Sequence, residues 1–193
     1  MIEKGGVNMA KVYAFLANGS EEVECLAVVD VLRRAGIDTK IISINETAEV
    51  TTSHGVRITC DRTIGDSDLS DADVLFLPGG MPGTAHLGAC EALTNALRAQ
   101  YAAGKRIAAI CAAPSVLGEL GLLEGKRATC YPGFEDRLRG AEHTGQGVVT
   151  DGTITTARGL GYALDLGLEL VRLLISEKAA KELKGTIQYD QVP

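Results

Sequence analysis

The stretch RIAAICAAPSVLGELG, residues 106–121, joins an apolar segment to the start of a helix through a single cysteine. Residues 107–110 carry no polar side chain, which is typical of a central parallel strand that helices cover on both faces. Pro114 suits the first turn of the next helix, because the N–H that proline lacks has no partner there. Cys111 is therefore predicted at the carboxyl end of a strand, where the chain turns sharply into a helix.

The same alternation of strand and helix extends along the chain. It predicts an α/β fold, in which a doubly wound, mostly parallel sheet is sandwiched by helices and ligands bind at the carboxyl ends of the strands. Two hairpins interrupt it, one over 49–60 turning at His54-Gly55 and one at Asp151-Gly152. Strands are predicted over 11–17, 38–44, 73–77, 107–110 and 127–130, and helices over 20–35, in a segment ending near 103, and over 114–120, 160–175 and 176–184.

Length and composition indicate one domain. The chain has 193 residues, 46% of them hydrophobic, which is enough for a single core. We assign the domain to residues 10–186. Residues 1–9 are interpreted as a disordered or mis-annotated extension, with Met1 or Met9 as the true start, and residues 187–193 as a tail.

The charge and cysteine content restrict the function classes. There are 25 acidic and 19 basic residues, for a net charge of −6, and no basic cluster, so neither nucleic acid nor a membrane is expected as a partner. The five cysteines are an odd number without a C-x-x-C pair. This pattern is typical of a reduced, cytoplasmic protein.

The residues around Cys111 are suited to a reactive thiol. A helix that starts directly after the cysteine directs backbone N–H groups and a partial positive charge at the sulfur, which favours the thiolate. Ala112 and Ala113 are small enough for the tight strand–turn–helix of a nucleophile elbow. A lone cysteine in an apolar run also fits a core position, so both interpretations stay open at this point.

Glu24 is the second candidate. Ser20 is a predicted N-cap, and helical spacing then aligns Glu24 with Val28 and Val31, on the stripe that packs against the sheet. A buried carboxyl there would keep its proton to higher pH and donate a hydrogen bond to a thiolate. The alternative is an ordinary solvated glutamate in an acidic first turn.

The segment PGGMPG, residues 78–83, again follows a strand. Its glycines let backbone N–H groups approach a ligand closely, as an oxyanion or phosphate site requires. The alternative is a tight turn. The segment is not a P-loop, because no Gly-Lys-Ser/Thr follows.

Five segments, in this order, resemble the ThiJ/PfpI superfamily over about residues 10–185. The resemblance implies a flavodoxin-like, class I glutamine-amidotransferase-like fold and a homodimer without metal or organic cofactor. It also implies that Cys111 is the nucleophile, that Glu24 hydrogen-bonds it, and that Gly80 and Ala112 supply oxyanion N–H groups. The segments are FLANGSEEVE (15–24), DVLRRAGI (30–37), VLFLPGG (74–80), AAICAAP (108–114) and ARGLG (157–161).

Two departures from the family pattern bear on the activity. Tyr131 stands where members with good glyoxalase activity carry a histidine, and tyrosine is a poor base at neutral pH. Ala112 stands where peptidase-type relatives carry a histidine, so peptidase activity is not expected. The resemblance therefore implies a weak, glyoxalase III-like or deglycase-like enzyme acting on a small aldehyde or glycated substrate. The alternatives are a redox-sensing stress protein, in which Cys111 is oxidised, and a holdase chaperone.

The remaining candidates have accessory roles. No histidine has metal-ligand spacing, so no metal site is predicted. His54 lies where the family has a basic residue near the dimer interface, and His143 lies in a loop that can swing toward Cys111. For the arginines, an ordinary surface role is the alternative to binding an anion. The accessory candidates are Gly79, Tyr131, Arg158, His54 and Arg34.

Overall fold

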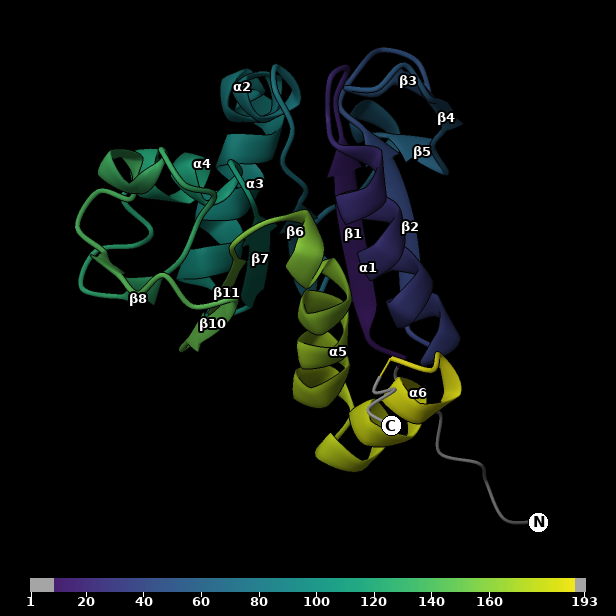
Figure 1. Cartoon of the computed structure of the whole chain (residues 1–193). Helices are drawn as coiled ribbons and strands as arrows, with labels where there is room; N and C mark the ends of the chain where they lie inside the picture. Colours follow the sequence, from purple (N-terminus) through teal and green to yellow (C-terminus); the bar gives the residue numbers. More distant parts are fainter. Residues whose placement is uncertain (1–8, 190–193) are drawn as a thin grey trace.

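The computed structural model describes residues 9–189, which form a seven-stranded sheet with helices on both faces (Figure 1). The strand order is β10-β11-β7-β6-β1-β2-β5, and all neighbours run parallel except β10 and β11. The strands are β1 (Lys11–Leu16), β2 (Asp38–Ser43), β5 (Arg62–Thr63), β6 (Val74–Leu77), β7 (Arg106–Ile110), β10 (Val148–Asp151) and β11 (Ile154–Ala157).

The order of the long parallel strands confirms the predicted fold class. Counted along the chain, β2, β1, β6, β7 and β11 follow the spatial order 2-1-3-4-5, which is the flavodoxin-like arrangement. The strand order reverses between β1 and β6, so ligands are expected beyond the carboxyl ends of these two strands. Two further sheets of two strands each lie outside the main sheet. One pairs β3 (Glu49–Thr51) with β4 (Arg57–Thr59) in antiparallel fashion, and the other pairs β8 (Arg127–Ala128) with β9 (Glu142–His143) in parallel.

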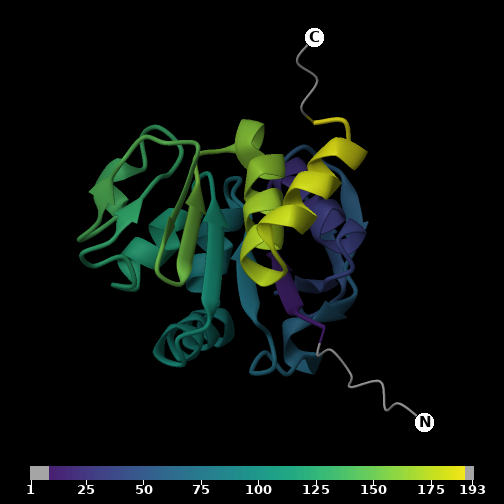
Figure 2. The same cartoon turned by 90° about the horizontal axis from the view of Figure 1, so that it is seen from below.

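Helices cover both faces because the strands are apolar on both. In β1, Val12, Ala14 and Leu16 pack with the helices over 22–34, 163–174 and 177–186, whereas Tyr13 and Phe15 pack with the helices over 83–89, 91–102 and 114–119 (Figures 1 and 2). Within residues 9–189, no helix is both long and apolar enough to cross a bilayer. The helices are α1 (Glu22–Arg34), α2 (Gly83–Ala89), α3 (Glu91–Ala102), α4 (Pro114–Glu119), α5 (Ala163–Leu174) and α6 (Glu177–Thr186), with short 3₁₀ turns at Ile64–Asp66, Glu135–Arg137 and Leu160–Tyr162.

Two details differ from the sequence predictions. The helical segment that ends near residue 103 is two helices, because Cys90 is extended (ψ 104°) and separates α2 from α3. The N-cap of α1 is Glu21, whose carboxylate accepts the Glu24 N–H at 2.6 Å. Ser20 is instead buried, and its hydroxyl accepts the Ala17 N–H at 3.0 Å.

The chain ends bear on the predicted domain limits. The last helix, α6, ends at Thr186. The predicted tail begins with ordered chain, since the Tyr189 hydroxyl donates to Asp165 Oδ2 at 2.6 Å. Residues 1–8 of the predicted extension and residues 190–193 of the tail lie outside the described residues.

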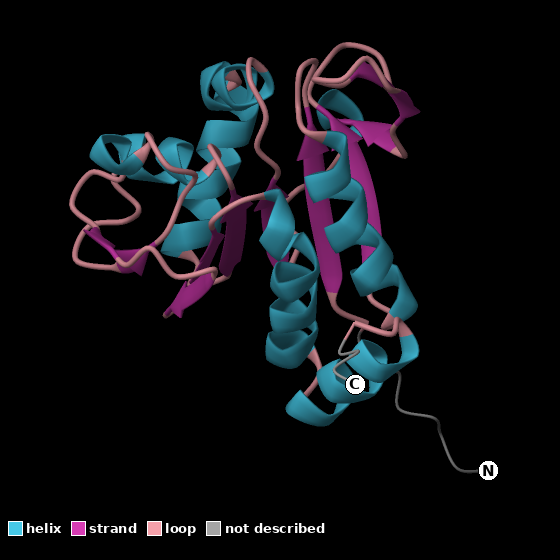
Figure 3. Ribbon diagram, viewed as in Figure 1, coloured by secondary structure: helices cyan, strands magenta, loops and turns pink. Residues whose placement is uncertain are grey.

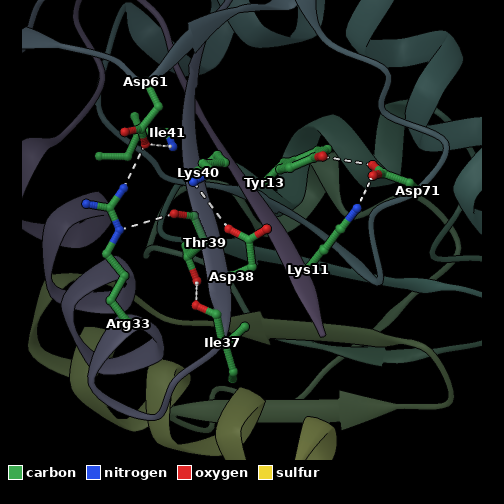
Figure 4. A network of polar contacts seen from close by, with 10 residues as sticks. All are labelled: Lys11, Tyr13, Arg33, Ile37, Asp38, Thr39, Lys40, Ile41, Asp61 and Asp71. Atoms are coloured by element: carbon green, nitrogen blue, oxygen red, sulfur yellow. Dashed lines mark hydrogen bonds and ion pairs between the residues drawn. The ribbon is translucent and has the colours of Figure 1, made fainter. Parts of the chain in front are cut away.

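A polar network fastens the amino ends of β1 and β2 to their neighbours (Figure 4). Asp71 pairs with Lys11 and accepts the Tyr13 hydroxyl at 2.8 Å, while Asp61 accepts from Arg33 at 2.7 Å and from the Ile41 N–H at 2.8 Å. These ion pairs are largely exposed, so each contributes little to stability. The network lies at the edge of the sheet opposite to the carboxyl ends of the strands.

Candidate active site

Three loops meet where β1, β6 and β7 end, at the same edge of the sheet (Figure 3). The first leads into α1, whose first turn carries Glu24, the second contains Gly79 and Gly80, and the third contains Cys111. Because β1, β6 and β7 are adjacent and parallel, their carboxyl ends bring these residues together.

Cys111 occupies a strained turn between β7 and α4. Its φ angle is 64°, a left-handed conformation that only one other non-glycine residue adopts within 9–189. The turn is fixed by two backbone hydrogen bonds, from the Cys111 N–H to Ala157 O at 2.9 Å and from the Tyr131 N–H to Cys111 O at 2.8 Å. The strained elbow predicted from the sequence is confirmed.

Glu24 lies on the buried face of α1 and is 1% exposed. Its Oε2 accepts the Gly79 N–H at 2.9 Å, and its carboxyl also hydrogen-bonds the Cys111 side chain and the Leu160 N–H. Burial raises the pKa of Glu24 to about 7, against the lowering effect of these hydrogen bonds. The predicted contact between Glu24 and Cys111 is therefore present.

The electrostatic environment of Cys111 differs from the expectation. Burial, and after it the neighbouring Glu24 carboxylate, together raise the pKa of the Cys111 thiol to about 12. The N–H groups of Ala112 and Gly80 hydrogen-bond the sulfur and oppose this shift, but they do not outweigh it. The start of α4 therefore does not by itself hold a thiolate. The two groups interact directly, so they titrate as a pair: the first proton leaves near pH 7, and above that pH the two side chains hold one proton between them.

Gly79 allows the two reactive side chains to approach each other. A Cβ atom at this position would lie 2.6 Å from Cys111 Cβ, 2.8 Å from Glu24 Oε2 and 3.1 Å from Ala112 N. Gly80 has a φ of 85°, and a Cβ there would overlap the backbone at Glu21. Both glycines are therefore required by the close packing of the three loops, and the Gly80 N–H is directed at the sulfur.

Replacing Gly79 with alanine should therefore separate Cys111 from Glu24. Inserting a methyl group into such a packed site typically costs about 1–3 kcal/mol. We expect a loss of this size in the free energy of unfolding, measured with urea, together with slower alkylation of Cys111. Gly185→Ala is the matched control, because a Cβ there meets nothing within 4 Å. If Gly79→Ala behaves like this control, the packing described here is incorrect.

The accessory candidates do not all reach the site. Tyr131 and Arg158 line one cavity beside the elbow. Arg34 lies at the far end of α1 from Glu24 and pairs with Asp30 at 2.6 Å. Since a helix rises 1.5 Å per residue, ten residues place Arg34 about 15 Å from Glu24 along the axis. The structure therefore does not bring Arg34 to Cys111 of the same chain.

The histidines also lie apart from the sulfur. His143 is exposed in β9, where it contributes, after the local backbone hydrogen bonds, to lowering the pKa of the Glu135 carboxyl. His54 Nδ1 lies 3.1 Å from Glu22 Oε1 and 3.8 Å from Glu21 Oε1. Glu21, Glu22 and His54 are the one group within residues 9–189 whose spacing would allow a metal ion. Sequence spacing did not predict this group, because His54 comes from a separate hairpin.

Two further contributions to the site escape sequence analysis. The Leu160 N–H reaches the Glu24 carboxyl, and Glu21 caps the helix that carries Glu24. A backbone donor leaves no mark on residue type, so Leu160 had no detectable signal beyond its place in the ARGLG segment. Glu21 did have one, since acidic residues are favoured at helix starts.

Comparisons with known proteins identify relatives over most of the chain. Residues 10–173 match the model of the DJ-1/PfpI family. Protein DJ-1 homolog B of Arabidopsis thaliana is 37% identical over 179 residues, which are 92% of this chain but only 41% of that protein. The chain thus spans less than half of that relative.

Two further matches extend over most of both chains. Glutathione-independent glyoxalase DJR-1.2 of Caenorhabditis elegans is 31% identical over 157 residues, 80% of this chain and 83% of that protein. The solved structure of oxidized Toxoplasma gondii DJ-1 superposes with a TM-score of 0.88 at 35% identity, covering 94% of this chain and 99% of that one.

Proposed function

The chain belongs to the DJ-1/PfpI family, and from this premise we propose that it is a cysteine-dependent enzyme that converts small 2-oxoaldehydes to 2-hydroxy acids. The observation that carries the proposal is the pairing of a strained, partly exposed Cys111 with a buried Glu24 carboxyl whose pKa is raised to about 7. Perturbed groups of this kind cluster at functional sites. The name of the C. elegans relative, a glutathione-independent glyoxalase, supports the same chemistry.

The first step is attack by the sulfur on the aldehyde carbon. The Cys111 proton passes to the Glu24 carboxylate as the S–C bond forms, so the thiolate arises only when the substrate is in place. The carbonyl oxygen becomes an oxyanion, which the N–H groups of Gly80 and Ala112 beside the sulfur would stabilise. Protonation of this oxygen by Glu24 gives a hemithioacetal.

The second step moves a hydrogen atom from the former aldehyde carbon to the neighbouring ketone carbon. Glu24 removes the proton from the first carbon and an enediol forms, and protonation of the second carbon then gives a thioester. Water attacks the thioester, the S–C bond breaks, and a hydroxy acid leaves with the Cys111 thiol restored. Glycated thiols or amines would enter by the same attack on carbon.

The test is the conversion of methylglyoxal to lactate by the purified protein with no added thiol. We expect lactate to form in proportion to the protein concentration, although slowly, because Tyr131 provides no base at the position where family members with good glyoxalase activity carry histidine. Methylglyoxal that disappears without lactate would reflect adducts on the protein and would contradict the proposal.

A second candidate function is redox sensing. It is supported by the N–H groups at Cys111, which would equally stabilise a sulfinate, and by the partial exposure of this thiol. Intact-mass analysis after treatment with peroxide separates the two functions. Cys111 that gains two oxygen atoms at low peroxide, in a protein without methylglyoxal turnover, would favour the sensor.

We also propose that the protein forms a homodimer through α1 and the His54 hairpin. Val23 and Leu26, three residues apart on one face of α1, are 48% and 40% exposed, and Val56 of the hairpin is 45% exposed. Light scattering at micromolar concentration should give twice the chain mass of 20.2 kDa. Leu26→Glu should shift the mass toward the monomer, whereas Ala99→Glu, at an exposed position of α3 on the other face of the sheet, should not. A wild-type monomer would exclude this interface.

A further inference from the structure

Beside the elbow lies a cavity of about 320 Å³ that neither Cys111 nor Glu24 lines. Its wall is mostly apolar and aromatic, and Arg158 is its one charged member. It is lined by Tyr131, Pro132, Arg158, Gly159, Leu160, Gly161 and Tyr162. Large apolar side chains are usually buried, yet Tyr131, Leu160 and Tyr162 are 50%, 48% and 37% exposed around this one cavity.

Glycines hold the two tyrosine rings in place. The Tyr162 ring lies so close to Gly147 that any Cβ atom there would overlap it, and a Cβ atom at Gly159 would lie 3.3 Å from Tyr131 Cδ2. Each ring therefore packs one side on bare backbone and leaves the rest of its surface open. A side chain that is fixed by packing loses little conformational entropy when a ligand binds to it.

The cavity adjoins both reactive groups. The Tyr131 N–H donates to Cys111 O at 2.8 Å, so this wall is attached to the elbow itself. The Leu160 N–H reaches the Glu24 carboxyl, so the opposite wall is attached to the second reactive residue. Arg158 directly follows Ala157, whose carbonyl accepts the Cys111 N–H. A substrate bonded to the sulfur would therefore reach these side chains by extending its remaining substituent past the elbow into the neighbouring cavity.

We propose that this cavity selects 2-oxoaldehydes whose ketone carbon bears an aromatic ring, so that the preferred substrate class is the arylglyoxals. The inference rests on the proposed function and specifies its substrate. Aromatic rings favour edge-to-face or offset contacts with tyrosine, and a guanidinium favours the face of a ring. The methyl group of methylglyoxal is too small to use these contacts.

The overall reaction is balanced by water alone. The arylglyoxal gains one water molecule, the aldehyde carbon is oxidised to a carboxylate, and the ketone carbon is reduced to a secondary alcohol, as in mandelate from phenylglyoxal. The S–C bond to Cys111 forms in the first step and breaks in the last, so no external oxidant or reductant is needed.

The experiment compares kcat/KM for phenylglyoxal and methylglyoxal with the full-length protein. Hydrophobic pockets typically discriminate by about 10–200-fold, and we expect a preference for phenylglyoxal of at least about 10-fold. Tyr162→Ala and Leu160→Ala should each lower this ratio several-fold. Ile175→Ala removes an equally exposed apolar side chain elsewhere and should leave the ratio unchanged. Rates are taken before arginine adducts form, as checked by intact mass.

The outcomes separate this inference from the proposed function. Methylglyoxal turnover with no preference for phenylglyoxal overturns the substrate class alone, whereas the absence of turnover with either aldehyde overturns both. The mass of Tyr162→Ala by light scattering provides a further check. If this variant is monomeric while the wild type is a dimer, the cavity wall is a contact between two copies of the chain, and the substrate assignment is wrong.

Discussion

Cys111→Ser should abolish the formation of lactate from methylglyoxal. Serine keeps the size of the side chain and the N–H contacts at the elbow, but its hydroxyl is a far weaker nucleophile at neutral pH than a thiol whose proton passes to Glu24. We expect a loss of at least about 10³-fold in kcat/KM, down to the rate without protein. The measurement is the appearance of lactate, separated by chromatography, because disappearance of the aldehyde also reports adduct formation.

Cys90→Ser is the matched control for this variant. Cys90 is the only other cysteine that is not fully buried within residues 9–189, and it lies between α2 and α3. Its replacement should leave turnover unchanged within about 2-fold. Lactate formation that survives in Cys111→Ser would refute the mechanism, whatever the result for Cys90.

Glu24→Gln should have the second largest effect. The amide has the shape of the carboxyl and can still accept the Gly79 N–H, but it cannot take a proton from the Cys111 thiol. Proton transfer by a positioned group is typically worth about 10²–10⁴-fold, and we expect kcat to fall within this range. The circular dichroism spectrum should remain that of the wild type.

Glu22→Gln tests whether the effect is specific. Glu22 is also buried in the first turn of α1, but its carboxylate is directed to His54 and Ser53. Its replacement should change kcat by less than about 3-fold. If both variants lose activity equally, the charge of the helix start matters and Glu24 has no special part in proton transfer.

The sequence predicted the positions of the reactive residues well, because these depend on local periodicity. An apolar run that ends in Cys111 marks a strand end, and Glu24 shares a helical face with Val28 and Val31, all three of which are buried. Adjacent parallel strands then bring the two side chains to one edge. The break of the helix at Cys90 was missed, although Gly88 lies two residues before it.

The electrostatics could not be predicted in the same way. The position of Cys111 directly before the start of α4 suggested a thiolate. The pKa of Cys111 is instead raised to about 12, because burial and the Glu24 carboxylate outweigh the local N–H groups. Burial depends on which loops close over the sulfur, and a single sequence does not contain that information. Arg34 illustrates a different limit of the sequence prediction. It is the last residue of the 13-residue helix α1, whereas Glu24 lies in the first turn, so the length of the helix keeps the two side chains apart whatever their residue types.

The central claim is that Cys111 and Glu24 share one proton, and the pH dependence of Cys111 alkylation tests it most directly. Labelling with iodoacetamide is mapped by mass spectrometry between about pH 5 and 9. Below pH 7 both Cys111 and Glu24 of the wild type carry a proton. Near pH 7 the pair loses one proton, and the remaining proton can lie on either group. A form with a Cys111 thiolate beside a Glu24 carboxylic acid then becomes accessible.

We therefore expect the wild-type rate at Cys111 to rise to a plateau through about pH 7, ahead of Cys60 and Cys130, because those two thiols are buried and have no carboxyl partner like Glu24 within residues 9–189, whereas Cys111 is partly exposed. In Glu24→Gln the step near pH 7 should be absent, and the rate should climb steadily with pH instead. Identical profiles for the wild type and Glu24→Gln, or faster labelling of Cys60 or Cys130 than of Cys111, would contradict the account.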